Sequence, residues 1–322
     1  MRLNRLIVPL RIAATVALIA IICGCQPTDN GEQAASAQGA PAAAPPSVGP
    51  PSLSALQNAT YLGIAEQPVT LVDGDWRGEP FVEGGTATPR VGLARDFRLT
   101  GDLNGDGIEE AVVMLWANWG GSGTFDYLAV MGRDESGPPL NLATAALGDR
   151  VKIRAAELVE ETIIVDAVQA GPDDAACCPG QKMQRSFVLE GDLLTEVSTE
   201  DMGRQSLADL AGVEWRLIHF NRDDEVPDDV QVTLIFDGDQ IGGSSGCNRY
   251  SGSVTEGMTP GALTVNIPMA ATMMACPPPA DQIERRYLDA LQHARQYSFL
   301  IGRLALTWRN DDQFGVMVFA PR

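Results

Sequence analysis

The stretch Ile241–Gly252 constrains this chain more than any other, because it places several glycines close to a cysteine. Gly242, Gly243 and Gly246 leave little side-chain volume, so another backbone segment can approach closely. The preceding residues 230–236 alternate apolar with mostly polar side chains, which is typical of a half-buried strand. We therefore expect this stretch to follow a strand and to lie against another part of the backbone.

The residues that follow predict one helix and three more strands. Three prolines come after Cys276, and Asp281 with Glu284 three residues later has the spacing of a helix N-cap and capping box. The apolar stripe of this helix consists of Ile283, Tyr287, Ala290, Leu291 and Ala294. The expected strands are residues 297–301, 304–308 and 314–319.

Together these segments resemble the META domain, the family typified by the heat-shock protein HslJ. The matching motifs are Leu210–Leu217, Gly246–Gly252, Thr272–Cys276, Glu284 with Tyr287, Leu288 and Leu291, and the closing strand. The resemblance implies an α+β fold over residues 205–322, in which one helix packs against a curved antiparallel sheet. It brings no catalytic residues, and it implies a loose tie to envelope stress and antibiotic tolerance.

The N-terminus has the features of a lipoprotein export signal. Three arginines accompany the apolar run 12–23, which is shorter than the ~20 apolar residues that span a membrane. Ile22–Cys25 resembles a bacterial lipobox with Cys25 as the lipidated residue, the alternatives being an ordinary cleaved signal or an uncleaved anchor. Gln26 follows in place of the Asp that would suggest inner-membrane retention. The resemblance favours an outer-membrane lipoprotein that faces the periplasm and contacts the membrane through its N-terminal lipid.

Composition divides the chain into four parts. A signal peptide with its lipobox covers residues 1–25. Residues 26–55 are rich in Ala, Pro, Gln and Ser, which predicts a disordered tether because so few apolar residues cannot form a core. Residues 56–200 form a β-rich domain, and residues 205–322 form the META-like domain. The net charge of −19 argues against nucleic acid as a partner.

The first domain shows a succession of short strand patterns and no helical pattern of any length, which predicts a mostly antiparallel β domain. The expected strands are residues 68–72, 95–99, 111–116, 124–131, 151–155, 163–168, 184–189 and 193–197. The segments 120–123 and 147–150 are expected to be a loop and a turn.

Between two of these strands lies a candidate calcium loop. Its oxygen ligands would be the side chains of Asp102, Asn104, Asp106 and Glu110 and the carbonyl of Ile108. The alternate spacing resembles the calcium loops of dockerins and integrin-type repeats, although the bidentate Glu of an EF-hand has no counterpart. There is a single copy, so no propeller is implied. Two interpretations stay open: a Ca²⁺ ion that pins the turn, or an Asx-rich hairpin turn that needs no metal.

The cysteines fit an oxidising compartment. Cys23 would leave with the signal and Cys25 would carry lipid, so four remain of the six in the chain. Export makes Cys247–Cys276 the first choice of disulfide. Adjacent cysteines have Cα atoms only ~3.8 Å apart, below the usual disulfide range, so a bridge between Cys177 and Cys178 is possible but strained. We expect them to be buried thiols in a Pro-Gly turn, with a redox or soft-metal site as the alternative.

No catalytic signature rises above background. The two histidines, His219 and His293, have neither the spacing of zinc ligands nor a nucleophile signature beside them. We therefore expect a non-enzymatic envelope lipoprotein that acts in envelope maintenance or stress tolerance and contacts an envelope protein or small ligand. The alternatives are an envelope hydrolase that uses carboxylates of the first domain, and a periplasmic binding or inhibitor module.

Overall fold

The computed structural model describes residues 49–133, 137–175 and 177–322. The predicted signal, Cys25 and residues 26–48 of the predicted tether lie outside this part of the chain. Helix α1 (Leu53–Leu56) lies inside the stretch expected to end the tether, where Ser52 caps it and Leu56 is fully buried. None of the helices in the described residues is long and apolar enough to cross a membrane.

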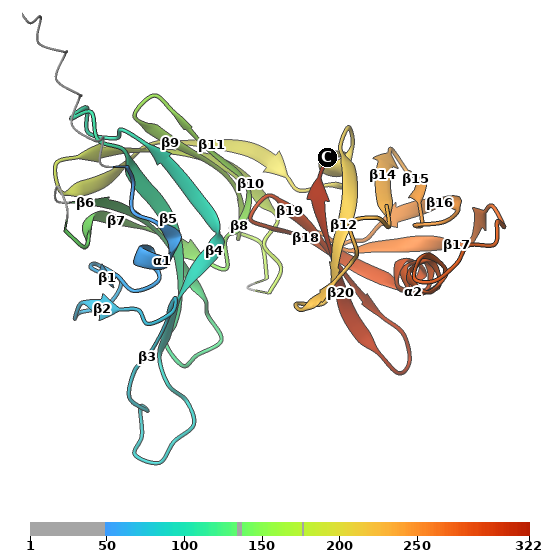
Figure 1. Cartoon of the computed structure of the whole chain (residues 1–322), viewed down its shortest axis with the longest axis horizontal. Helices are drawn as coiled ribbons and strands as arrows, with labels where there is room; N and C mark the ends of the chain where they lie inside the picture. The colour runs from blue at the N-terminus through green and yellow to red at the C-terminus, as the bar shows by residue number, and fades with distance from the viewer. Residues whose placement is uncertain (1–48, 134–136, 176) are drawn as a thin grey trace, which may run out of the picture. The chain divides into compact units, whose positions relative to one another are not determined.

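A five-stranded antiparallel sheet forms the centre of the N-terminal part (Figure 1). A hairpin of β1 (Thr60–Tyr61) and β2 (Val69–Thr70) follows α1. The sheet has the strand order β3-β4-β5-β6-β7. Its strands are β3 (Asp75–Arg77), β4 (Arg90–Gly101), β5 (Glu110–Asn118), β6 (Phe125–Arg133) and β7 (Pro139–Asp149).

A four-stranded antiparallel sheet of order β11-β10-β9-β8 comes next. Its strands are β8 (Lys152–Val159), β9 (Thr162–Gln169), β10 (Gln181–Glu190) and β11 (Leu193–Arg204). Val112 and Leu128 of the first sheet share a core with Ile163 and Phe187 of the second. The two sheets therefore pack face to face.

Strand β5 is buried on both of its faces, which explains its unbroken apolar run. Val112 and Met114 belong to the core shared with the four-stranded sheet. Val113 and Leu115 belong to a second core with Leu56 of α1 and residues of β1 and β2. Because successive side chains of a strand point to opposite faces, a strand with a core on each side must be apolar at every position.

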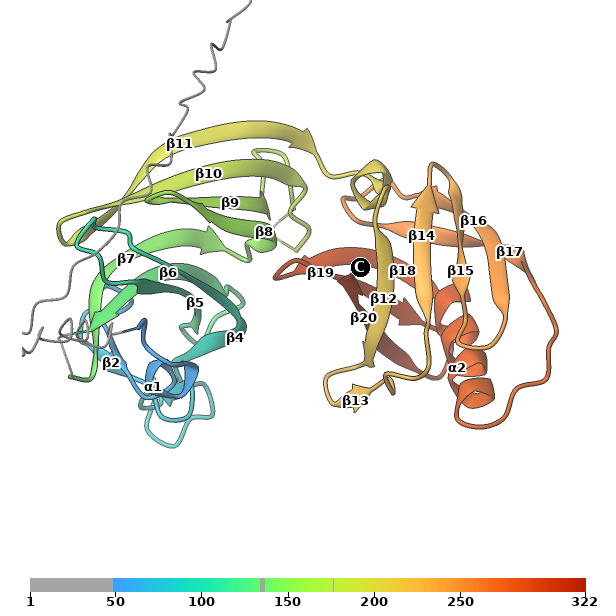
Figure 2. The same ribbon diagram turned by 45° about the horizontal axis from the view of Figure 1, so that its top comes forward.

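The C-terminal part is a curved sheet of nine antiparallel strands with one helix beside it (Figure 2). The short helix η1 (Leu207–Leu210) leads into it. Its strands run in the order β17-β16-β15-β14-β12-β20-β19-β18, and β13 pairs with β12. The strands are β12 (Glu214–Phe220), β13 (Asp224–Glu225), β14 (Thr233–Asp237), β15 (Gln240–Ser244), β16 (Arg249–Glu256), β17 (Leu263–Ala271), β18 (Ala294–Leu300), β19 (Arg303–Arg309) and β20 (Phe314–Pro321).

The two edge strands of this sheet approach each other at one end. Ala262 forms an isolated bridge with Gln296, and the Tyr297 amide donates to the Gly261 carbonyl at 2.7 Å. Helix α2 (Ala280–Gln292) buries Tyr287, Ala290 and Leu291 against the sheet. These three residues of the predicted apolar stripe are confirmed, and Ile283 packs partly buried against the same core. Ala294, the last residue of the predicted stripe, lies in β18 and not in the helix.

Several expectations need correction. The chain is more β-rich than an α+β label implies, because α2 is the only helix of more than four residues among those described. The N-cap of α2 is Pro279, so Asp281 lies in the first turn and the predicted capping box does not form. Residues 147–149, expected to be a turn, are the end of β7. Strand β7 was missed because its apolar residues are mostly small.

Gly261 offers a test of how the sheet edges meet. It has φ of +74°, and a Cβ atom there would lie 2.5 Å from the Tyr297 carbonyl oxygen. Gly238 also has positive φ (+60°), but no atom lies within 4 Å of its Cβ position. Both Gly→Ala variants suffer the left-handed penalty of roughly 1–2 kcal/mol. We expect urea unfolding to find Gly261→Ala about 2 kcal/mol less stable than Gly238→Ala; equal stabilities would contradict the close approach.

Candidate functional site

The buried side chain of Asn248 joins three segments of the META-like part. Its Oδ1 atom accepts hydrogen bonds from Thr272 Oγ1 at 2.8 Å and from the Met274 amide at 2.7 Å. Its Nδ2 atom donates to the Met274 carbonyl at 3.1 Å and to Glu284 Oε2 at 3.0 Å. Because an amide side chain has two donors and one acceptor oxygen with two lone pairs, this set uses its full capacity.

Glu284 fixes the same cluster from helix α2. Its Oε1 atom accepts from the Asn248 amide at 3.3 Å and from the hydroxyl of Ser245, which is fully buried. Ser245 Oγ also lies 2.8 Å from the Asn248 carbonyl. The carboxylate thus ties the helix to the β15–β16 hairpin, which is why it does not reach back to cap its own helix.

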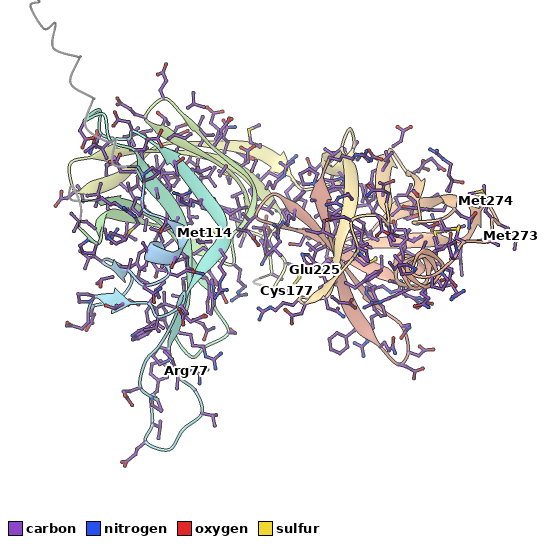
Figure 3. The ribbon with its side chains drawn as sticks, viewed as in Figure 1. Arg77, Met114, Cys177, Glu225, Met273 and Met274 are labelled. Atoms are coloured by element: carbon purple, nitrogen blue, oxygen red, sulfur yellow. A yellow bond between two sulfur atoms is a disulfide. The ribbon has the colours of Figure 1, made fainter. Side chains whose placement is uncertain are left out.

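The predicted disulfide between Cys247 and Cys276 is present, with Cα atoms 6.1 Å apart. Together with the bonds to Asn248 it holds the segment 272–276 at two points. Met273 and Met274 are nevertheless 96% and 61% exposed, and Figure 3 places both at the outer end of this part of the molecule. Met273 and Met274 are therefore two adjacent, exposed apolar side chains on a segment whose backbone is fixed.

Two buried tyrosines, Tyr250 and Tyr287, also belong to the motifs that resemble the META domain. The hydroxyl of Tyr250 donates to the Thr233 carbonyl at 2.9 Å and lies 2.6 Å from the hydroxyl of Tyr287. Burial raises the pKa of both phenols well above the usual value, so both are neutral at physiological pH. The two hydroxyl groups bond to each other, and that of Tyr250 also bonds to the backbone, so both side chains have a structural role in the domain.

A negative charge introduced at Asn248 should lower the stability of the folded protein. Asn248→Asp would place a second carboxylate beside Glu284 and remove the donor to the Met274 carbonyl. We expect a loss of about 2–4 kcal/mol at neutral pH in urea unfolding. Glu284→Gln in the same chain should recover part of it, because the like charges are removed. Asn266→Asp on exposed β17 is the control and should change stability little; a similar loss in both single variants would contradict this account.

The predicted calcium ligands lie in one loop, and their side-chain oxygen atoms accept hydrogen bonds from the backbone amides of that loop. Asp102 accepts from the amides of Gly105 and Asp106 through Oδ1 (2.8 and 3.2 Å) and from that of Gly107 through Oδ2 (2.9 Å). Asn104 accepts from the Asp106 amide at 2.9 Å. The loop is therefore held by its own side chains, as the metal-free interpretation expects.

The remaining ligands behave in the same way. Asp106 accepts from the Ile108 amide at 2.7 Å. Glu110 is 2% exposed and accepts from the Leu103 amide at 2.8 Å, and burial is the main cause that raises its pKa, with Asp106 and Asp102 adding to the rise. Over the described ranges 49–133, 137–175 and 177–322, no group of three or more His, Cys, Asp or Glu side chains is arranged to hold a metal ion. The expected convergence of carboxylates is thus not found, and calcium binding stays a prediction.

A melting experiment distinguishes the two interpretations of this loop. If Ca²⁺ binds the folded loop, millimolar CaCl₂ should raise the Tm of the wild type by mass action and leave Asp102→Ala unchanged. If the loop is a metal-free turn, Ca²⁺ should raise neither. Asp192→Ala, which removes an acid from another turn, is the control for general screening. Equal Ca²⁺-dependent rises in all three proteins would contradict a site at Asp102.

The expectation for Cys177 and Cys178 is wrong in two respects. The two residues form a disulfide with each other, and Cys177 is exposed rather than buried. Asp174 fixes the base of their turn by accepting from the amides of Gly171 and Gly180, both at 2.8 Å. Adjacency alone therefore did not prevent the bridge.

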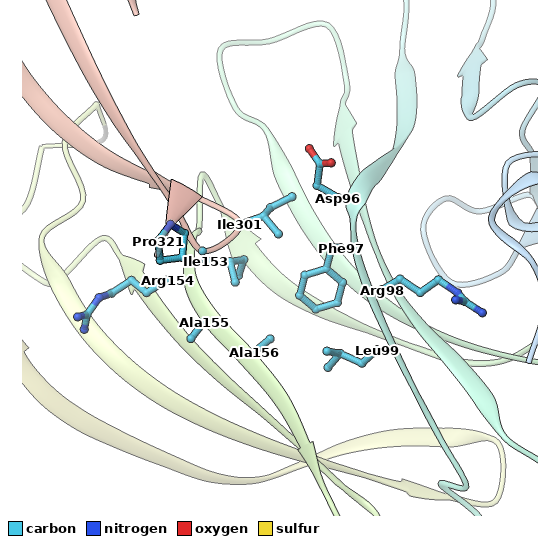
Figure 4. Close-up of a pocket in the computed structure, with 11 residues that line it drawn as sticks. Asp96, Phe97, Arg98, Leu99, Ile153, Arg154, Ala155, Ala156, Ile301 and Pro321 are labelled. Atoms are coloured by element: carbon cyan, nitrogen blue, oxygen red, sulfur yellow. The ribbon is translucent and has the colours of Figure 1, made fainter. Parts of the chain in front are cut away.

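Two clefts lie where β4 and β8 meet the turn after β18. The first has a volume of about 340 Å³ and is lined by residues 96–99, 153–156, 301–302 and 321. Figure 4 shows Phe97 and Ile301 facing each other across it, while Arg98 points away. Asp96 pairs with Arg303 at 2.9 Å, and the Gly302 amide donates to the Ile153 carbonyl at 3.1 Å, which fixes the turn.

The second cleft, of about 500 Å³, contains a carboxyl group that the sequence analysis did not single out. Asp126 on β6 is 7% exposed and accepts from the Val151 amide at 2.9 Å. Burial raises its pKa to about 7, although the Val151 bond and Lys152 act in the opposite direction. Strand alternation places Asp126 on the same face as Leu128 and Val130, and this pattern could have identified it.

The pKa of Asp126 predicts how stability depends on pH. Because the folded-state value lies above the ordinary 3.8, the folded protein holds the proton more tightly between about pH 4 and 7. This group therefore lowers stability as the pH rises through that range. Asp126→Asn, which keeps an acceptor for Val151, should be more stable than the wild type at pH ~8, by at most about 4 kcal/mol, and similar near pH ~4. A constant difference measured by urea unfolding at both values would contradict the assignment; exposed Asp192→Asn is the control.

A protein-family model matches the C-terminal part of the chain. Residues 208–320 match the family model of the META domain. Among solved structures, the NMR structure of a protein from Burkholderia xenovorans is similar, with 26% sequence identity over 36% of this chain and 86% of that one, and a TM-score of 0.29. No curated protein matches the chain. The family match supports the META domain expected from the sequence.

Proposed function

We propose that the chain is a non-enzymatic component of the bacterial cell envelope that uses its META domain to bind a partner. The META domain belongs to a family of envelope-associated proteins, which supports the location. The proposal rests on which side chains of the META motifs are bonded within the fold and which are exposed. The polar groups of Asn248, Glu284 and Tyr250 form hydrogen bonds within the domain. Met273 and Met274 of the same motifs are exposed instead.

Methionine suits such a contact. Its thioether side chain is flexible and polarisable, so it fits partners of different shapes. The backbone beneath is fixed by Asn248 and the disulfide, so little backbone freedom is lost on binding. A fixed segment with adaptable side chains is well suited to recognise an apolar surface on another envelope protein.

The proposed location rests on the N-terminal sequence. Acylation of Cys25 would hold the chain at the outer membrane, and the predicted tether of residues 26–55 would connect it to the folded part, which begins with α1 at Leu53. At ~3 Å per residue in an extended Pro-rich chain, such a segment reaches several tens of Å. The folded part could then contact partners some distance from the membrane while it remains concentrated at the surface.

Complementation tests the location and the contact surface together. A strain that lacks the protein should survive detergent or cell-wall antibiotic less well than its parent. The full chain should restore survival, whereas Cys25→Ser and the pair Met273→Ser with Met274→Ser should not. Met258→Ser is the matched control, since Met258 is fully exposed but lies in the turn between β16 and β17. Full rescue by the double serine variant would remove the contact surface, and mass spectrometry that finds an unmodified N-terminus would remove the anchor.

A carboxylate-dependent hydrolase is the second candidate, and Asp126 is the observation in its favour. A buried carboxyl with pKa of about 7 in a cleft could act as general acid at neutral pH. This candidate predicts that the purified protein hydrolyses envelope glycan or peptide and that Asp126→Asn loses the activity. The non-enzymatic proposal expects no turnover by either protein.

A further inference from the structure

Two cavities adjoin at the five-stranded sheet and use residues of neither the Asn248 cluster nor the calcium loop, although β18 and the turn after it supply Phe299, Leu300 and Ile301 to the first of them. The first is the cleft of about 500 Å³ that contains Asp126. The second, of about 420 Å³, is lined by residues 86–88, Arg90, Asn118 and Gly120. Trp116 and Thr124 line both cavities, so the two adjoin at these residues, and we call the pair of cavities the Trp116 groove.

Trp116 is held in the middle of this groove by its neighbour on β4. It lies opposite Gly92 in the strand register, and a Cβ atom at Gly92 would collide with the indole ring. The missing side chain lets the ring lie close to the β4 backbone, while the residue stays only partly buried. A supported indole with accessible surface loses little conformational entropy when a ligand packs on it.

Polar groups of mixed type surround the indole. Asp126 is more than nine-tenths buried, and only its Oδ2 atom has a described partner, the Val151 amide. Lys152, Arg95 and Arg90 supply donors along the groove. Asn118 shapes one end by donating to the carbonyls of Gly121 and Gly123 at 3.1 and 2.7 Å. The groove thus offers an aromatic surface with both acceptors and donors.

We propose that the Trp116 groove binds a saccharide chain, with one sugar ring packed on Trp116 and hydroxyl groups bonded to Asp126 and Thr124. A sugar ring combines an apolar C–H face with hydroxyls that donate and accept, and these are the properties that the groove complements. A lipid would leave the polar groups unpaired, which is costly. Each cavity is of ordinary ligand size, so a chain of several sugars fits better than one.

Titration with defined oligosaccharides tests the proposal. Chitotetraose, cellotetraose and maltotetraose are added to the folded protein while calorimetry and tryptophan fluorescence are followed. We expect at least one to bind with Kd below about 1 mM. Trp116→Ala should weaken that binding about tenfold or more. Trp119→Ala is the matched control, because Trp119 follows the same strand and is also half-buried but lines neither cavity.

Thr124→Val provides a variant of the same shape in case Trp116→Ala fails to fold, and it should also weaken binding. No binding by any of the three sugars, or binding unchanged in a folded Trp116→Ala or Thr124→Val protein, would overturn the proposal. These residues are distinct from Met273 and Met274, so the outcome is independent of the proposed partner contact. Circular dichroism of each variant confirms that a loss of binding is not a loss of fold.

Discussion

The C-terminal domain depends on one buried amide. Asn248 bonds to the segment at Thr272 and Met274 and to Glu284 of α2, so one side chain replaces the backbone pairing that a sheet would otherwise supply. Buried polar groups destabilise a fold unless each is satisfied, and a fully satisfied cluster specifies one arrangement of the segments it joins. The disulfide fixes the same hairpin to the same segment. The position of the helix, the loop and the exposed methionines therefore follows from a few polar contacts.

The N-terminal part is organised by a different constraint. Strand β5 has a core on each side, so its residues at 111–115 are all buried and apolar. Such a strand leaves no room for polar groups until its end, where Trp116 and Asn118 reach the surface beside Gly92 and the loop at 120–123. Asp126 and Glu110 are carboxyl groups within the buried layer, and burial raises the pKa of both, that of Asp126 to about 7. Polar groups and accessible aromatic surface therefore gather where the double-sided core ends.

The sequence predicted the parts of this structure that leave a periodic or spaced signal. The strand patterns, the apolar face of α2 and the Cys247–Cys276 pair have such signals, and all were found. Glu284 was assigned to a capping box because local spacing cannot reveal a distant partner such as Asn248. The same limit applies to the cavity at Trp116 and Asp126. These two residues pair on adjacent strands, but the cavity also includes Phe299, Leu300 and Ile301, which lie far away in the sequence. The vicinal disulfide was possible from the sequence but was not the favoured interpretation, because the Cα atoms of adjacent cysteines are closer than in most disulfides.

Two weak contact surfaces on a tethered chain would act together. The proposed saccharide groove and the proposed methionine contact would each offer a modest area, and contacts of that kind bind weakly when they act alone. Once one is engaged, the other meets its target at an effective concentration set by the linkage, commonly millimolar for short flexible connections. An anchor at Cys25 would add a third restraint by confining the chain to the membrane surface. Weak and separable contacts would then suffice for stable residence in the envelope, and each could still be released on its own.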